Sequence, residues 1–419
     1  MRLKQVIASD KAVTGGGAPG VAGVSRTAGG TIRAPLLLTL LDGCWCARAA
    51  PPTLQLVHVL YRHGARTPIN PYPTDPNRGA WPQGDGQLTN EGKRNQLELG
   101  RYLRRRYDGF LPAAYHLNYT RVESTDVDRT LMSAQVNLAG LYPPQGADVW
   151  DAQLAWQPIP VHTRPVQTDL KLKSYEWCAA YQRERERVFE SPEMAALVAR
   201  NAALFAYLGE HSGKDVTDLE KLSYLYDTLW IEAYHNLTTP DWALAPPPGA
   251  TAPAFPDLMK PLNDIEFGVF GATPLLRRLG GGPLLKEMLE NMQARVDGTL
   301  QPPSRRMFMY SAHNVNVACV LTTLQVYNGL APPLSSCLLV ELHSDPDAGP
   351  LVQLFYRNDS STEPHQLQLP GCDVSCPWSE FVRLTKNVVP DDVAGNARTK
   401  TSCTDASLFL RSLLYEHTV

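Results

Sequence analysis

The fold is decided by the stretch Leu54-Gln55-Leu56-Val57-His58-Val59-Leu60-Tyr61, which leads directly into Arg62-His63-Gly64. This stretch is short, almost continuously apolar and partly β-branched. Such a pattern is typical of a strand that is buried on both faces of an α/β sheet. A second stretch, Met307-Phe308-Met309-Tyr310, has the same character and leads into Ser311-Ala312-His313-Asn314. We therefore predict two buried strands, each followed closely by a histidine.

Helices are expected to follow these strands and a third one. Thr89 is expected to cap a helix that ends near Arg106, and the strand that ends at residues 121–125 precedes a helix over residues 126–141. Alternating residues at 338–342 and 351–356 predict a terminal pair of strands. Together these elements predict an α/β fold with a mixed, largely parallel central sheet that is flanked by helices.

The character of the sequence changes between the two halves of this sheet. Residues 178–261 contain a highly charged stretch, two helical stretches and a Pro-rich loop, and they carry no strand pattern. We predict an inserted, smaller helical cap domain here. The predicted organisation is a leader at 1–49, the first part of the α/β domain at 50–177, the cap at 178–261 and the second part of the α/β domain at 262–419.

Composition excludes several classes of protein. The chain has 419 residues, of which 39 are Lys or Arg and 42 are Asp or Glu, so its formal net charge is −3. This near balance argues against a protein that binds nucleic acid or an anionic membrane surface. The hydrophobic fraction of 43% indicates a globular chain. No segment has about 18 or more consecutive apolar residues, so we expect no membrane span in the mature chain.

The N-terminal residues predict a route through the secretory pathway. The apolar run at residues 34–41 precedes Cys46-Ala47-Arg48-Ala49-Ala50, which offers a small-residue cleavage site, so we interpret residues 1–49 as a signal segment. The alternative is a disordered N-terminus before a buried segment. Three Asn-X-Ser/Thr triplets support secretion and predict glycosylation at Asn118, Asn236 and Asn358.

The eight cysteines do not indicate a metal site. No Cys-X-X-Cys pair occurs, and no Cys/His cluster has the spacing of a zinc site, so we expect neither a metal nor another cofactor. Cys372 and Cys376 are spaced for a small disulfide loop, and the alternative is a pair of reduced cysteines in the core. The redox state of the compartment decides between the two.

Two histidines and three arginines stand at predicted ends of strands and helices. Ligands of open α/β sheets bind beyond the carboxyl ends of the strands, where His63 and His313 are expected. Arg62 and Arg66 flank the first histidine, and Arg129 lies in the first turn of a helix. Each residue alone has an ordinary interpretation, a loop histidine or a surface ion pair. Together they predict a pocket in which arginines bind phosphate and His63 attacks phosphorus.

The stretch Tyr61-Arg62-His63-Gly64-Ala65-Arg66-Thr67-Pro68 resembles the RHGxRxP signature of the histidine acid phosphatases. The resemblance continues through residues 88–92, 124–130, 310–313 and 369–377, so it covers almost everything from about Leu54 to Cys403. It is greatest to animal prostatic, lysosomal and insect venom acid phosphatases. It implies hydrolysis of phosphate monoesters through a phosphohistidine on His63, with the phosphate bound by Arg62, Arg66, Arg129 and His313.

The same resemblance implies further features of the molecule. It implies an α/β domain with an inserted helical cap, a secreted or lysosomal location, a homodimer and no metal. It also implies disulfides between Cys178 and Cys403 and between Cys372 and Cys376. The cysteine near Trp230 that would normally pair with Cys337 is absent. Cys337 and Cys319 are therefore expected to be free, or to pair in a way that the resemblance does not give.

One position departs from the family. The family carries Asp directly after the second histidine as proton donor to the leaving group, and this chain has Asn314 there. An amide cannot donate a proton as a carboxylic acid does, so turnover is expected to fall most for poor leaving groups. Another acid, from the cap or from Asp126 or Asp128, could replace the missing proton donor. We favour a secreted acid phosphatase of altered efficiency. The alternatives are a phosphate-ester-binding protein that has lost catalysis, a phosphoglycerate-mutase-like phosphotransferase and a structural glycoprotein.

Overall fold

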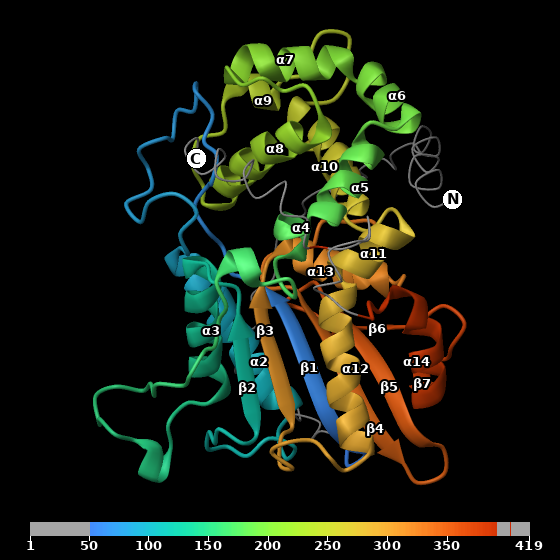
Figure 1. The fold of residues 1–419 in the computed structure, drawn as a ribbon. Helices are drawn as coiled ribbons and strands as arrows, with labels where there is room; N and C mark the ends of the chain where they lie inside the picture. Colours follow the sequence, from blue (N-terminus) through green and yellow to red (C-terminus); the bar gives the residue numbers. More distant parts are fainter. Residues whose placement is uncertain (1–50, 392–402, 404–419) are drawn as a thin grey trace, which may run out of the picture. The chain divides into compact units, whose positions relative to one another are not determined.

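The computed structural model describes residues 51–391 and Cys403. Its centre is a seven-stranded sheet in the order β2-β3-β1-β4-β5-β6, with β7 paired to β5. β1 (Leu54–Arg62), β3 (Met307–Ala312) and β2 (Thr120–Ser124) are parallel neighbours (Figure 1). Arg62 lies opposite Ala312, and Ser124 lies opposite Ser311. The three carboxyl ends therefore meet at one edge of the sheet.

The other strands of the sheet are antiparallel. β4 (Cys337–Asp345) pairs with β1, and β5 (Gly349–Arg357) pairs with β4, β6 (His365–Leu367) and β7 (Ser375–Pro377). A short turn joins β4 to β5, and such a hairpin connects antiparallel strands only. The predicted α/β fold with a mixed sheet is confirmed, whereas the predicted largely parallel pairing holds only for β1, β2 and β3.

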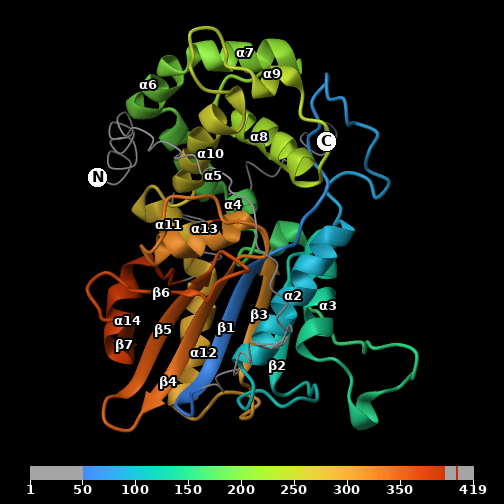
Figure 2. The same ribbon diagram turned by 180° about the vertical axis from the view of Figure 1, so that it is seen from behind.

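Helices cover both faces of this sheet (Figures 1 and 2). Val57 and Val59 of β1 pack against two of them, whereas Leu56 and Leu60 point to the opposite face and pack against the others. β1 is thus buried on both faces, as its apolar sequence predicts. The helices are α2 (Asn90–Arg106) and α3 (Asp128–Leu141) on the first face, and α12 (Gly282–Val296), α13 (Asn314–Thr323) and α14 (Trp378–Thr385) on the second.

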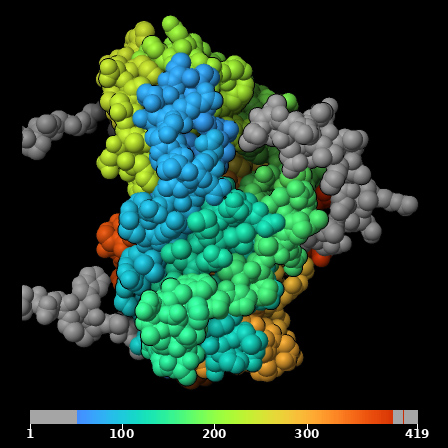
Figure 3. Space-filling view, turned by 90° about the vertical axis from the view of Figure 1, so that its left-hand side faces the viewer, coloured from blue at the N-terminus to red at the C-terminus, as the bar shows by residue number. Residues whose placement is uncertain are grey.

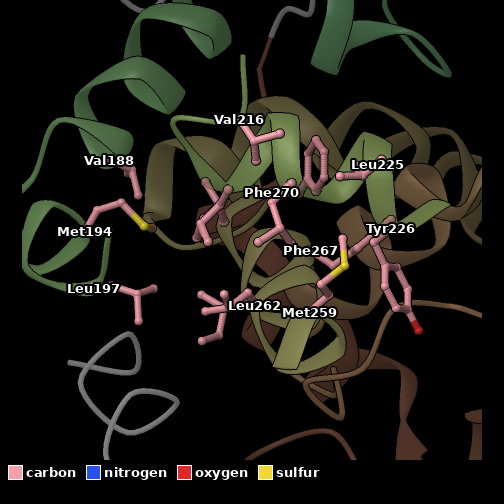
Figure 4. Packing of buried hydrophobic residues seen from close by; sticks show 14 of the residues in the cluster. Val188, Met194, Leu197, Val216, Leu225, Tyr226, Met259, Leu262, Phe267 and Phe270 are labelled. Carbon is pink, nitrogen blue, oxygen red and sulfur yellow. The ribbon is translucent and has the colours of Figure 1, made fainter. Parts of the chain in front are cut away.

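A helical region, residues 174–280, lies in the sequence between β2 and β3. Its hydrophobic core is built around side chains such as Leu225, Met259 and Phe270 (Figure 4). The division into a cap at exactly the predicted bounds, 178–261, remains a prediction, since this core extends to Leu279. The helices are α4 (Ser174–Trp177), α5 (Ala179–Phe189), α6 (Pro192–Arg200), α7 (Ala202–Ser212), α8 (Leu219–Tyr234), α9 (Asp241–Leu244), α10 (Met259–Val269) and α11 (Pro274–Gly280).

The loop at residues 67–89 joins β1 to α2 and lies against the helical region (Figure 3). The Asn70 carbonyl accepts hydrogen bonds from Lys214 Nζ (2.7 Å) and from Thr228 Oγ1 (3.2 Å). At the end of the loop, Thr89 caps α2, because its Oγ1 accepts the Gly92 N–H at 3.1 Å, as predicted. Hydrogen bonds therefore hold this loop against the helical region.

The cysteines of the described residues form two disulfides, Cys178–Cys403 and Cys372–Cys376, which are the pairings that the resemblance implied. Cys319 and Cys337 are free and buried. Within residues 51–391 and Cys403, no helix is long and apolar enough to cross a membrane, and no cluster of His, Cys, Asp and Glu has the makings of a metal site. The leader predicted at residues 1–49 lies outside the described residues.

Candidate active site

His63 and His313 meet at the carboxyl edge of the sheet. They directly follow β1 and β3, which are hydrogen-bonded neighbours, and the two ring centroids lie 5.6 Å apart. Both side chains are buried, with 2% and 4% of each residue exposed. Two histidines that are far apart in the sequence are thus fixed next to each other by the parallel ladder.

The hydrogen bond of His63 determines which of its nitrogens is reactive. Nδ1 lies 2.8 Å from the carbonyl oxygen of Gly64. Since a carbonyl only accepts, Nδ1 carries the proton and Nε2 keeps its lone pair. Burial, followed by the charges of Arg129, Arg62 and Arg66, lowers the pKa of His63 well below its ordinary value. The site therefore favours the neutral imidazole of His63, with Nε2 as the nucleophilic nitrogen.

Gly64 permits a close approach of the backbone beside this histidine. A Cβ built on Gly64 would lie 2.1 Å from the carbonyl oxygen of Gly92, in the first turn of α2. The Gly64 N–H also donates to Ser133 Oγ of α3 at 3.2 Å. The end of β1 is thereby held between α2 and α3, with no room for a larger residue.

Three guanidinium groups converge on the same place. Arg62 donates to the Pro332 carbonyl (2.7 Å), Arg66 donates to both oxygens of Asp227 (2.9 and 3.1 Å), and Arg129 lies 3.4 Å from His313 Nδ1. Burial and the neighbouring guanidinium groups lower the pKa of Arg62 and of Arg129 to about 10. Each group therefore stabilises an anion that binds among them.

The three Nε–H groups of these arginines are buried and have no hydrogen-bond partner among the described residues. A buried donor without a partner is costly, and three such donors in one cluster are rare in native structures. An oxyanion that accepts hydrogen bonds from them would remove this cost. The chemistry of the cluster therefore fits a phosphate group.

His313 is oriented by its neighbours. Because the Arg129 guanidinium donates to Nδ1, the His313 Nε2–H donates to Thr125 Oγ1 at 3.0 Å. Burial, followed by the charges of Lys173 and Arg129, lowers the pKa of His313 well below its ordinary value. His313 is thus neutral, and its ring is held in place by Arg129 and Thr125.

Asn314 begins α13, directly after His313. Its Oδ1 accepts the N–H of Val315 at 3.1 Å, and the residue is half-buried. Neither Val315 nor Asn316 supplies an acid. Asp126 and Asp128, which the sequence offered as replacements, are exposed, and Asp128 accepts a hydrogen bond from Gln87. The structure therefore does not place these two carboxylates in the cluster.

Two charged residues of the cluster escape sequence reasoning. Asp227 reaches Arg66 from α8, across 161 positions of sequence, and Lys173 lies just before α4 with its charge acting on His313. Both come from segments without a recognisable motif. Their part in the site is set by how the helical region packs on the sheet, which a single sequence does not encode locally.

The predicted glycosylation sites lie at turns and loops. Asn236 is exposed, whereas Asn118 and Asn358 are half-buried. Modification of these three residues stays a prediction.

The chain matches known proteins along most of its length. A family model described as "Histidine phosphatase superfamily (branch 2)" matches residues 53–357. The chain is 40% identical to prostatic acid phosphatase of Rattus norvegicus over 347 aligned residues, and this alignment covers 81% of this chain and 88% of the relative. It is 38% identical over 372 residues to lysosomal acid phosphatase of the same species, which covers 87% of this chain and 85% of the relative.

A solved structure shares the fold. The apo form of Hafnia alvei phytase matches with a TM-score of 0.60 over 81% of this chain and 98% of that chain, at 19% sequence identity. At this identity the likeness concerns the fold alone.

Proposed function

We propose, on the premise that this chain belongs to the histidine phosphatase superfamily (branch 2), that it is an acid phosphatase that hydrolyses phosphate monoesters. The observation that carries the proposal is the cluster itself. A free imidazole nitrogen of His63 stands among three arginines whose buried Nε–H groups lack partners. This arrangement suits a phosphorus electrophile with three negatively polarised oxygens.

The reaction proceeds in two displacements. His63 Nε2 attacks phosphorus, and the ester oxygen leaves. Water then attacks the phosphohistidine and releases inorganic phosphate. Arg62, Arg66 and Arg129 stabilise the charge on the phosphoryl oxygens in both steps, and His313 completes the phosphate pocket.

The efficiency of this enzyme depends on the leaving group. With Asn314 at the proton-donor position, departure of an alkoxide is not assisted from that residue. The loss of a general acid lowers the rate by about 10²- to 10⁴-fold, and aryl esters, which leave as stable phenolates, are affected least. The natural substrate class therefore depends on whether another group gives the proton.

Two alternative functions use the same cluster. A phosphate-ester-binding protein would retain the arginine cluster and bind phosphate or vanadate without turnover. A phosphoglycerate-mutase-like phosphotransferase would move phosphate between hydroxyl groups instead of releasing it. The similarity to acid phosphatases over more than four-fifths of the chain favours hydrolysis over both.

We further propose that the protein matures in the secretory pathway and acts as a secreted or lysosomal enzyme. The two disulfides and the names of the lysosomal and prostatic relatives support this. We also propose a homodimer, for which the exposed Trp150, Leu154 and Trp156 offer an apolar contact face.

The test is phosphate release from p-nitrophenyl phosphate by the purified chain and by a His63→Ala variant. We expect turnover in acid by the wild type and none by the variant, and an acid-labile phosphoenzyme only in the wild type. Substantial turnover by His63→Ala would show that the nucleophile is another residue. Tight vanadate binding without any turnover would favour the binding protein.

A further inference from the structure

The cluster contains a buried ammonium group that the two displacements do not use, that of Lys173, whose charge acts on His313. We propose that Lys173 gives the leaving oxygen its proton, in place of the acid that is missing at Asn314. This inference rests on the proposed phosphatase function and names the residue that completes it.

Hydrogen bonds fix the segment before α4 against the first turn of α13. Asn316 Nδ2 donates to the Leu172 carbonyl at 2.6 Å, and Asn316 Oδ1 accepts the backbone N–H of His313 at 3.0 Å. One side chain therefore ties the residue before Lys173 to the residue before Asn314. This link holds the backbone beside Lys173 against the first turn of α13, where Asn314 stands.

The side chain of Lys173 is held inside the protein. Only 8% of it is exposed, and Nζ donates to Glu176 Oε2 at 2.5 Å. Its charge acts directly on His313, where it lowers the imidazole pKa more than Arg129 does. An ammonium with three N–H groups that uses one of them on Glu176 has two left for other acceptors.

The surroundings of Lys173 make its proton easier to give. Burial lowers the pKa of Lys173 below its ordinary value, and Arg129 adds to this, while Glu176 and Asp169 act in the opposite direction. A lysine with a lowered pKa is a better general acid than a free one. The groups that face it are Glu176 and Tyr175 of α4, Arg129 of α3, His313 before α13, and Asp169.

The carboxyl groups near the cluster are less suited to this role. Asp227 accepts two hydrogen bonds from Arg66, and Glu176 accepts from Lys173 and is 47% exposed. The oxygens of both groups are engaged as acceptors from these cations. Asp126 and Asp128 are exposed.

The chemistry balances with Lys173 in this role. His63 Nε2 forms the N–P bond as the P–O bond breaks, and the leaving oxygen takes a proton from Lys173 Nζ, so a neutral alcohol departs. Water then forms the new O–P bond while the N–P bond breaks and its electron pair returns to Nε2. The proton of that water goes to the neutral Lys173 amine, which restores the ammonium.

The experiment compares an alkyl phosphate, β-glycerophosphate, with p-nitrophenyl phosphate in the full chain. We expect Lys173→Met to lower kcat for the alkyl ester by about 100-fold or more and kcat for the aryl ester by only a few fold, with KM little changed. Lys173→Arg keeps the charge but does not release a proton, so it should not restore the alkyl reaction. Adding Asn314→Asp to Lys173→Met should restore it.

Lys171→Met is the matched control. Lys171 lies two residues earlier, is also buried, and contacts Glu123 and Glu287 instead of the cluster. It should lower stability without changing the ratio of the two rates. Equal losses on both esters in Lys173→Met, or full alkyl turnover in Lys173→Arg, would overturn the role of Lys173 while leaving the phosphatase intact. A wild type that hydrolyses neither ester would overturn the proposed function itself, and this inference with it.

Discussion

Asp227 of α8 holds Arg66 through two hydrogen bonds from one guanidinium nitrogen, at 2.9 and 3.1 Å, and so joins the helical region to the arginine cluster. The pair is largely withdrawn from water, with 8% of the Arg66 side chain and 25% of the Asp227 side chain exposed. The negative charge of Asp227 offsets part of the positive charge that the three arginines place together. It also stands where it repels a phosphate group.

Replacing Asp227 should therefore change anion binding and stability in opposite directions. In Asp227→Asn we expect inorganic phosphate to inhibit more strongly, on the order of tenfold, because a nearby negative charge has been removed. The midpoint of thermal unfolding should fall, because Arg66 loses its counter-charge. Competitive inhibition constants and thermal unfolding measure the two effects. Asp215→Asn, an exposed partner of Lys221, is the control, and an unchanged inhibition constant in Asp227→Asn would contradict the expectation.

Asn314→Asp should restore a carboxylic acid beside the cluster. We expect turnover of an alkyl phosphate to rise by about tenfold or more, with a smaller gain for p-nitrophenyl phosphate, because a carboxylic acid is a stronger proton donor than the Lys173 ammonium and only the poor leaving group needs a proton. Steady-state kcat for the two esters gives the comparison. Equal gains on both would mean that residue 314 does not face the leaving group.

Gly64→Ala should damage the fold at the nucleophile. The new Cβ would lie 2.1 Å from the Gly92 carbonyl oxygen, and both partners belong to the backbone, so neither moves easily. We expect the free energy of unfolding to fall by about 3 kcal/mol or more, measured by denaturant titration. Gly79→Ala, where no atom lies within 4 Å of the added Cβ, serves as the control. A Gly64→Ala protein as stable as the control would show that the two backbones are not in contact.

Glu232 should make the protein more stable in acid. Its side chain is fully buried, and burial, followed by the charge of the nearby Asp75, raises its pKa to about 8. Between about pH 4.5, the ordinary value, and pH 8 the native state keeps a proton that the unfolded chain releases. The contribution of Glu232 to stability is therefore full below pH 4.5 and is lost as the pH rises to about 8, by at most about 1.4 kcal/mol per pH unit.

Glu232→Gln tests this pH dependence, since the amide is uncharged at every pH. The free energy of unfolding of the variant, relative to that of the wild type, should rise steadily over this window, and at pH 8 the variant should exceed the wild type. Glu210→Gln, on the exposed side of α7, should leave the slope unchanged. A difference in free energy of unfolding between Glu232→Gln and the wild type that stays constant from pH 5 to pH 8 would contradict the assignment.

The sequence predicts the part of the site that is carried by strand ends. β1 and β3 have continuous apolar patterns, so His63 and His313 could be placed at their ends, and Thr89 could be placed as a helix cap. Asp227 and Lys173 could not be found this way, because their approach to the cluster depends on packing between distant helices. The antiparallel half of the sheet was missed in part because β6 and β7 have three residues each, too few for a periodic pattern.

The position of the helical region in the chain has a consequence for how such enzymes diversify. The helical region, residues 174–280, is added to a strand ladder that already fixes both histidines. A lineage can therefore lengthen, shorten or recompose this insertion, and with it the choice of ester, while the nucleophile keeps its place. Innovation in substrate preference and conservation of chemistry are assigned to separate stretches of one polypeptide.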